Sequence, residues 1–278
     1  MSEVKGTPYL YKKGEIHIQD WQPNLYMQFG KERTQPSIDL TARINMQNPE
    51  RIIDIGCGPG NSTNVLAARW RKAEITGLDS SAAMIEEAKS KYHGINWVHA
   101  DAGGDLSYLG KFDIVFSNAA IQWIPNHEAL LPGLFGMLNK GGVLAVQVPS
   151  TVNMPIHIEL QKLIKTDKWK NLFEEKISQN NYRAENAEYF YNIICGLSAE
   201  VDLWETRYFH VMYTRADIVK WWSSTGLWPY LECFGDDDEG RQSFLADYEA
   251  ALKESYAVQS DGKVLFPFTR IFFMVVND

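Results

Sequence analysis

The sequence predicts an α/β fold built on a doubly wound, mostly parallel sheet. One observation is RIIDIGCGPGNST, residues 51–63, in which a short apolar strand turns through three glycines into a polar helix start. Another is the series of apolar runs, each followed by a helical pattern, that spans roughly residues 49–149. The fifth run, residues 141–149, is a near-continuous apolar stretch of the kind that a parallel sheet buries.

The elements follow in chain order. Residues 1–17 are expected to form a flexible extension, and residues 18–278 a single domain. Within it, residues 18–48 suggest two short helices broken at Pro36, which form a lid. Residues 49–149 form the half that binds a cofactor, and Gly141 and Gly142 are expected to end the helix before its fifth strand. Residues 150–278 hold helical patterns and two strand-like runs, 201–213 and 265–276.

The glycine turn indicates which cofactor binds. Counted from Gly56, the last position of a dinucleotide fingerprint is Asn61 instead of glycine or alanine, which disfavours a nicotinamide or flavin cofactor. Asp54, two residues before the first glycine, would repel a pyrophosphate and suits a cofactor with a cationic end. The pattern Asp-x-Gly-x-Gly-x-Gly resembles the first motif of class I S-adenosylmethionine (SAM) methyltransferases.

The downstream strand ends agree with this interpretation. Asp79 ends the second strand about 20 residues past the turn, where an acid accepts both ribose hydroxyls. Asp101 ends the third strand and suits an adenine amino group, and Met84 follows the Ser80-Ser81 helix cap. We predict SAM as cofactor, S-adenosylhomocysteine as product and no metal ion. The predicted cofactor-binding residues are Asp54, Gly56, Gly58, Gly60, Asp79, Ser80, Met84, Asp101, Ala102, Asn118 and Ala119.

Composition excludes some classes of function. The chain has 278 residues, a formal net charge of -8 and a sequence pI near 5.3. This charge disfavours a nucleic acid as partner, because phosphate binding needs a basic surface. Three cysteines give no disulfide framework, and no apolar run is long enough for a membrane span or resembles a signal peptide. We expect a cytoplasmic protein with no membrane partner; the oligomeric state stays open, with a monomer as the simplest case.

Narrower segments resemble the trans-aconitate 2-methyltransferase family. They are DWQPNLYMQFGKERTQPSIDL, SNAAIQWIPNHEALLP, VDLWETRYFH and FPFTRIFF, together with the motifs above. The resemblance implies a Rossmann-like, seven-stranded sheet with an antiparallel last strand, helices that cap the cofactor, and methyl transfer from SAM to one carboxylate of trans-aconitate. The family pattern has Asp-Asn where this chain has Ser150-Thr151, which leaves the exact acid open. His157 matches the family pattern.

The predicted substrate is a small polycarboxylic acid. An ionised carboxylate is already a nucleophile, so no catalytic base is needed, and the acid must be held by cations, best by bidentate arginine. Arg33 is the first choice; Arg270 and Arg207 come second, because in alternating strands they are expected to point outward. The predicted substrate-binding residues are Arg33, Tyr26, Gln122, Trp123, His157, Tyr208 and Arg270.

Two other functions stay open. One is methyl transfer to a different small-molecule or carrier-bound carboxylate, although a carrier protein would need a basic docking face that the sequence does not show. The other is a non-catalytic protein that binds SAM as a sensor or partner.

Overall fold

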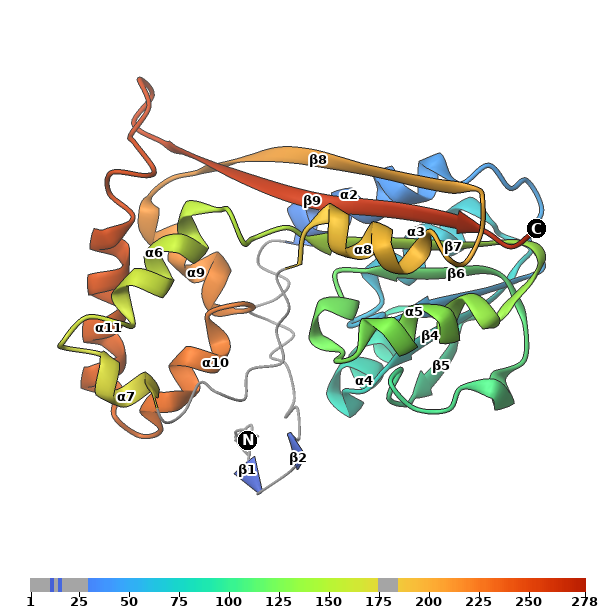
Figure 1. Ribbon diagram of the computed structural model, residues 1–278, viewed down its shortest axis with the longest axis horizontal. Coiled ribbons are helices and arrows are strands. Elements are labelled where there is room, and N and C mark those ends of the chain that lie inside the picture. The colour runs from blue at the N-terminus through green and yellow to red at the C-terminus, as the bar shows by residue number, and fades with distance from the viewer. Residues whose placement is uncertain (1–10, 13–14, 17–29, 175–184) are drawn as a thin grey trace. The chain divides into compact units, whose positions relative to one another are not determined.

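The computed structural model describes residues 11–12, 15–16, 30–174 and 185–278, and every structural statement below concerns these residues (Figure 1). The predicted site residue Tyr26 and most of the predicted extension lie outside them. A two-stranded sheet pairs β1 (Tyr11–Lys12) with β2 (Glu15–Ile16).

A seven-stranded sheet forms the centre of the fold, with the strand order β5-β4-β3-β6-β7-β9-β8. The first five strands along the chain pair in parallel. β9 runs antiparallel to β7, since Gly141 N donates to Asn277 O and Ser150 N donates to Thr269 O. The sheet and its antiparallel end therefore confirm the predicted fold class. The strands are β3 (Arg51–Ile55), β4 (Glu74–Asp79), β5 (Asn96–His99), β6 (Phe112–Asn118), β7 (Leu138–Pro149), β8 (Val201–Met212) and β9 (Val264–Val276).

The strand order reverses direction between β3 and β6. From β3 the chain moves outward to β4 and β5, and it then returns to β6 on the other side of β3. Right-handed crossovers place the helices of the two halves on opposite faces of such a sheet. The helices are α2 (Gly30–Arg43), α3 (Asn61–Arg69), α4 (Ala82–Lys91), α5 (His127–Gly136) and α8 (Ala187–Ile194), of which α2 packs on α3 and α5 on α8 (Figure 1).

The chain divides into two compact units. Unit 1 comprises residues 1–148, 186–205 and 271–278, and unit 2 comprises residues 149–185 and 206–270, so β8 and β9 each contribute to both. Unit 2 holds the helices α6 (Pro155–Leu163), α7 (Lys170–Glu174), α9 (Arg215–Ser223), α10 (Trp228–Leu231) and α11 (Asp238–Ala251). That these helices cap a cofactor stays a prediction.

Aromatic side chains build the core of unit 2. Phe244 is fully buried, and its ring centroid lies 5.1 Å from that of Phe173 and 5.3 Å from that of Trp169. Trp221 and Trp222 of α9 are also buried. These aromatic side chains therefore form ordinary hydrophobic core.

The expected helix break at Pro36 is wrong. Pro36 lies inside α2, which continues to Arg43 as one helix. A proline removes one backbone hydrogen bond of a helix, but packing can hold the helix together. Here Ser37, Leu40, Thr41 and Ile44 form a buried stripe with the spacing of one helix face.

The expected position of Gly141 and Gly142 is also wrong. α5 ends earlier, at Gly136, and β7 already begins at Leu138. The glycines lie within β7, where the pairing with β6 shifts register and Gly141 has a φ of 76°. Such an irregularity needs a residue that tolerates positive φ, so glycine marks a strand irregularity instead of a helix end.

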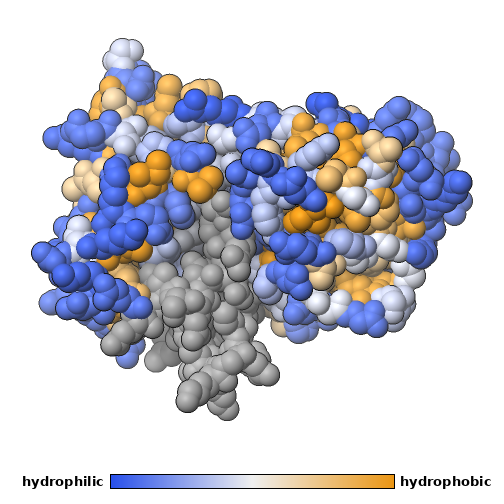
Figure 2. Space-filling view, viewed as in Figure 1, coloured by the Kyte–Doolittle hydropathy of each residue, from blue (hydrophilic) through white to orange (hydrophobic). Residues whose placement is uncertain are grey.

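The described surface mixes hydrophobic and hydrophilic residues, as Figure 2 shows for one face. Large apolar side chains that are exposed include Phe209, Val211 and Tyr213 of the β8 region. Among the described residues, no helix combines the length and apolar composition needed to cross a lipid bilayer.

Leu40 of α2 tests the packing of this helix. Leu40 is fully buried, so Leu40→Ala should lower the free energy of unfolding by about 2–5 kcal/mol. The matched control is Ile38→Ala on the same helix, where the side chain is 43% exposed and the change should stay within about 0.5 kcal/mol. Urea denaturation followed by circular dichroism measures both; equal losses would contradict the assigned helix face.

Candidate active site

The glycine turn after β3 lies at the point where the strand order reverses. Gly56 N and Cys57 N both donate to Leu78 O of β4, at 2.8 and 2.9 Å, which fixes the turn to the neighbouring strand. Gly56 has a φ of 70°, and a Cβ added there would overlap the Cβ of Ala120, which follows β6. The ends of β3, β4 and β6 therefore meet at the carboxyl edge of the sheet, where open α/β sheets bind ligands.

Asp79 joins the end of β4 to the same turn. Its Oδ2 accepts a hydrogen bond from Gly58 N at 2.8 Å, and its Oδ1 accepts one from Ser81 N at 2.8 Å. Burial raises the pKa of this carboxyl, and the two backbone donors partly offset the effect. Each carboxylate oxygen can accept a second hydrogen bond, so Asp79 keeps capacity for hydroxyl donors of a ligand.

Asp54 lies fully buried beneath the turn. Its Oδ2 accepts hydrogen bonds from Ser62 Oγ at 2.6 Å and from Thr63 Oγ1 at 2.7 Å, both in the first turn of α3. Burial raises the pKa of the Asp54 carboxyl to about 6, although the two hydroxyl donors oppose the rise. Asp54 thus anchors the start of α3 to β3, and its predicted contact with a cofactor stays a prediction.

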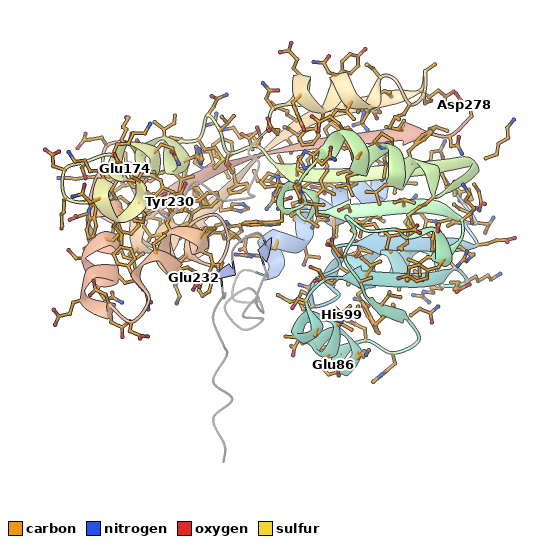
Figure 3. All side chains as sticks on the ribbon, turned by 60° about the horizontal axis from the view of Figure 1, so that its bottom comes forward. Glu86, His99, Glu174, Tyr230, Glu232 and Asp278 are labelled. Atoms are coloured by element: carbon orange, nitrogen blue, oxygen red, sulfur yellow. The ribbon has the colours of Figure 1, made fainter. Side chains whose placement is uncertain are left out.

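The β4 and β5 ends carry the other predicted cofactor residues. Asp101 is exposed two residues past β5, and its Oδ1 accepts from Gly103 N at 2.8 Å. Ser80 O lies 3.0 Å from the ring Nε2 of His99, a residue that is labelled in Figure 3. Met84 is buried, with its backbone N–H donating to Ser81 Oγ, and Ala102 is also buried.

The segment after β6 has an unusual backbone. Ala119 has a φ of 55°, a conformation that few residues other than glycine adopt. Its N–H donates to Gln147 O at 2.8 Å, and its carbonyl accepts from Gln122 Nε2 at 2.7 Å. The side-chain oxygens of Asn118 and Gln122 are buried without a hydrogen-bond partner among the described residues. Buried acceptors of this kind at a strand end point to a ligand that supplies donors.

This edge fits the predicted cofactor. Gly58 leaves open space where a side chain would stand, Asp79 offers carboxylate oxygens, and Asn118 offers a buried acceptor. Together they match a ligand with hydroxyl and ammonium donors. Gln147, at the end of β7 and fully buried, completes the edge; sequence reasoning did not identify it, because it lies within an apolar run.

The predicted substrate residues fall on both units. Arg33, Gln122 and Trp123 belong to unit 1, whereas His157, Tyr208 and Arg270 belong to unit 2. Arg33 and Arg270 are buried, 6% and 4% exposed, and Arg207 is exposed. The outward orientation expected for Arg207 is therefore confirmed, and that expected for Arg270 is wrong. The Arg270 guanidinium lies 4.8 Å from the ring centroid of Phe268.

His210 is a neighbour of Arg270 that sequence reasoning missed. Its ring stacks on Trp221 at 4.8 Å between centroids, and its Nε2 is buried without a hydrogen-bond partner among the described residues. Burial, and then the charge of Arg270, lower the pKa of His210 to about 4. Two residues further back along β8, Tyr208 stacks parallel to His210. Burial likewise lowers the pKa of His157.

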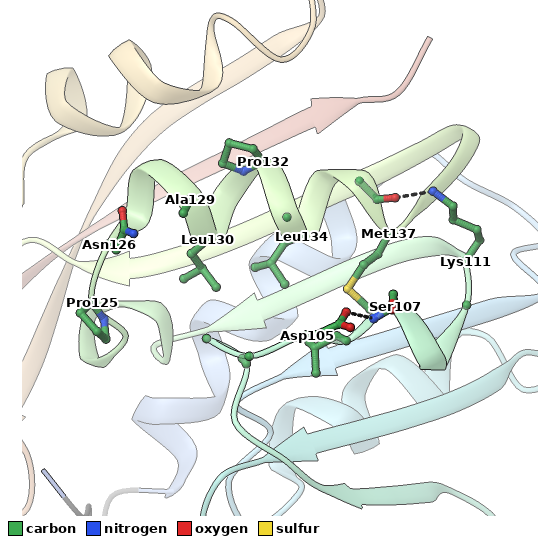
Figure 4. A pocket seen from close by; sticks show the side chains of 17 residues that line it. Asp105, Ser107, Lys111, Pro125, Asn126, Ala129, Leu130, Pro132, Leu134 and Met137 are labelled. Atoms are coloured by element: carbon green, nitrogen blue, oxygen red, sulfur yellow. Dashed lines mark hydrogen bonds between the residues drawn. The ribbon is translucent and has the colours of Figure 1, made fainter. Parts of the chain in front are cut away.

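A separate pocket of about 420 Å³ runs along α5 (Figure 4). Leu130, Leu134 and Met137 line one side, and the segment around Asp105 and Ser107 lines the other. Of the predicted site residues that the structure describes, only Ala102 borders this pocket. In the part of the chain that the structure describes, no group of three or more His, Cys, Asp or Glu side chains could hold a metal ion.

Known proteins resemble this chain in sequence and in fold. A family model described as "Methyltransferase domain" matches residues 52–142. Trans-aconitate 2-methyltransferase of Shigella dysenteriae is 38% identical over 92% of this chain and 97% of its own length, and that of Escherichia coli K12 is 37% identical over the same shares. Haemonchus contortus phosphoethanolamine N-methyltransferase 2, solved with S-adenosylhomocysteine, has the same fold, with a TM-score of 0.51 and 18% identity over 88% of this chain and 53% of that one.

Gly56 tests the contact with the segment after β6. Gly56→Ala should abolish measurable S-adenosylhomocysteine binding, because the added Cβ overlaps Ala120 and the φ of 70° strains alanine. Gly58→Ala meets no atom within 4 Å at a φ of 54°, so it carries the backbone strain without the overlap. Isothermal titration calorimetry should show weaker binding for both and a larger loss for Gly56→Ala; equal losses would mean that the overlap does not matter.

Asp54 predicts a specific pH dependence of stability. Its pKa rises from 3.8 to about 6 on folding, so the folded protein binds this proton more tightly. The stability that protonated Asp54 contributes is fully present below pH 4 and is lost as the pH rises through 6. The contribution of Asp54 to the free energy of unfolding changes by roughly 3 kcal/mol over this range. Asp54→Asn is always neutral and keeps an acceptor. Its free energy of unfolding, relative to wild type, should therefore increase from pH 4 to pH 7.

Asp105→Asn is the control, because hydrogen bonds from Ser107 lower the pKa of the exposed Asp105 carboxyl. The stability that this carboxylate contributes is already present above pH 4 and is lost only at lower pH, so the stability of Asp105→Asn relative to wild type should stay nearly constant from pH 4 to pH 7. Denaturation series at pH 4, 5, 6 and 7 measure both variants. A pH-independent difference for Asp54→Asn would contradict the raised pKa.

Proposed function

Because this chain belongs to the trans-aconitate 2-methyltransferase family and is a SAM-dependent methyltransferase, we propose that it methylates trans-aconitate on one carboxylate. The products are the monomethyl ester and S-adenosylhomocysteine. One observation carries the proposal: identity of 38% to a trans-aconitate 2-methyltransferase over 92% of this chain.

The carboxyl edge of unit 1 would hold the cofactor. Asp79 would accept the ribose hydroxyls, and Asp101 would accept the adenine amino group. The turn of Gly56, Gly58 and Gly60 would lie against the ligand without side chains. Asn118 and Ala119 would contact the amino-acid end. These roles stay proposals, supported by the hydrogen bonds that already bring Asp79 to Gly58.

The chemistry demands alignment more than proton transfer. Bound SAM supplies a methyl group on a sulfonium, and attack by a carboxylate oxygen forms the C–O bond as the C–S bond breaks with its electron pair left on sulfur. No proton moves, so the chain needs no general base. The chain instead has to hold the acid in line with the methyl group, and such positioning can lower a barrier by roughly 7 to 11 kcal/mol.

A polycarboxylate must overcome the net charge of the chain, which is -8. Local cations have to outweigh this repulsion. Arg33, which is buried, is the first proposed carboxylate ligand, and Arg270, also buried, is the alternative. Arginine fits because its planar guanidinium binds a carboxylate through two parallel hydrogen bonds. Gln122, Trp123, His157, Tyr208 and Tyr26 stay proposed as further substrate contacts.

The departure from the family pattern lies beside Arg270. Ser150 N donates to Thr269 O, and Thr151 is fully buried. Ser150-Thr151 therefore borders the strand that carries the proposed ligand Arg270. A different small carboxylic acid is the second candidate substrate, and this position favours it. A cytoplasmic location and the absence of nucleic-acid and membrane partners stay predictions.

A panel of acids tests the proposed substrate. The purified protein is incubated with SAM and trans-aconitate, cis-aconitate, isocitrate or citrate, and S-adenosylhomocysteine and the methyl ester are quantified by mass spectrometry. We expect ester mainly from trans-aconitate. Ester from another acid would change the proposed substrate but not the proposed reaction. S-adenosylhomocysteine binding without ester from any of the four acids would exclude them as substrates and leave the cofactor assignment unchanged.

Arg33→Lys tests the proposed carboxylate ligand. Loss of a bidentate hydrogen bond to a charged group should lower kcat/KM for the acid by about 10- to 150-fold, which corresponds to ~1.5–3 kcal/mol. The affinity for S-adenosylhomocysteine should stay unchanged. Arg43→Lys is the matched control, because Arg43 is an exposed arginine of the same helix that pairs with Asp202 at 2.8 Å. Wild-type kinetics in Arg33→Lys would place the carboxylate ligand elsewhere.

A further inference from the structure

The segment from Asn118 to Trp123 contains an unfavourable backbone conformation at Ala119. An alanine at a φ of 55° lies in the left-handed region, at a cost on the order of 1 kcal/mol or more. Such a conformation persists only where neighbouring groups enforce it. At Ala119 two hydrogen bonds do so, one at each side of the residue.

The two hydrogen bonds differ in kind. Ala119 N–H donates to a backbone carbonyl, that of Gln147, and so extends the regular ladder between β6 and β7. The carbonyl of Ala119, in contrast, depends on the Gln122 side chain, whose Nε2 donates to it at 2.7 Å. Gln122 is 3% exposed, so water cannot readily replace this donor.

The strained residue determines where Ala120 lies. Ala120 directly follows Ala119, and its Cβ occupies the space that a side chain at Gly56 would take. The next residues form a 3₁₀ turn, Ile121–Trp123, in which Trp123 N donates to Ala120 O at 3.0 Å. A relaxed, negative φ at Ala119 would redirect Ala120 and remove it from the glycine turn.

We propose that Gln122 is a positioning residue, whose side-chain amide holds the Ala119 carbonyl and thereby keeps Ala120 packed against the cofactor-binding turn at Gly56. This role rests on the proposed cofactor site and differs from direct contact with the acid. Gln122 acts before any ligand arrives, by keeping the edge in the conformation that binds. A protein that holds this conformation only part of the time binds its ligand more weakly in proportion.

The test combines Gln122→Met with Ala119→Gly. Methionine matches the length of glutamine without a donor, so Gln122→Met should weaken S-adenosylhomocysteine binding by about tenfold, within the range expected for an unsatisfied buried carbonyl. Glycine adopts positive φ at no steric cost, so Ala119→Gly removes the backbone strain that the Gln122 amide opposes, and its own affinity is the reference for the double variant. The double variant should recover most of the lost affinity.

A matched control separates this role from general destabilisation. Gln161→Met removes a comparable side-chain donor, since Gln161 Nε2 donates to Tyr230 Oη at 2.9 Å in unit 2. It should lower the melting temperature without changing S-adenosylhomocysteine affinity. Ala119→Val, with Gln122 intact, gives an independent check if Gln122→Met does not fold: a β-branched residue at this φ should weaken binding as well.

Calorimetric titration with S-adenosylhomocysteine, together with thermal melting, measures all five variants and the wild type. Unchanged affinity in Gln122→Met, or the absence of recovery in the double variant, would overturn the positioning role. Wild-type protein that does not bind S-adenosylhomocysteine would instead overturn the cofactor site itself, so the two failures are distinguishable.

Discussion

Several glycines in unit 1 allow neighbouring side chains to pack directly against the backbone. A Cβ at Gly60 would lie 2.8 Å from the Trp97 ring, and one at Gly77 would overlap the same ring. Trp97 of β5 can therefore cross over β4 and reach the glycine turn of β3. Together with the contact between Gly56 and Ala120, this brings four strand ends to one place. The edge where the cofactor is proposed to bind depends on glycine at these positions, because no side chain would fit there.

Acids then hold the edge in place. Asp54 accepts hydrogen bonds from two hydroxyls at the start of α3, and Asp79 accepts one from the backbone amide of Gly58. Both carboxyls have raised pKa values because they are buried, so each costs stability. Burying a charge of this kind is typical of a site that exists to bind something.

The sequence predicts the cofactor half well because its signals are local. Glycines, strand-end acids and the Ser81 cap are each recognised from the few residues around them in the chain, and the structure places them at the strand ends and the helix start that the pattern indicates. The expectations for Pro36 and Gly141 are wrong because tertiary packing decides the structure at both positions. A buried stripe of side chains stabilises α2 across Pro36, and Gly141 lies at an irregularity of β7.

Features that depend on residues far apart in the sequence could not be predicted from such local signals. The burial of Arg270 depends on the fold of unit 2, and His210 becomes notable only because Trp221 and Arg270 are its neighbours in that fold. The backbone of Ala119 has no sequence signature, since alanine rarely adopts positive φ. Its two hydrogen-bond partners, Gln147 and Gln122, are revealed by geometry alone.

The strand order also has a consequence for synthesis. β8 leaves the ribosome long before β9, yet it reaches the sheet only through β9, which lies between it and β7. Until β9 emerges, β7 and β8 both present strand edges that have no partner in the sheet. The nascent chain therefore passes through a stage in which β7 and β8 expose strand edges that other chains could pair with.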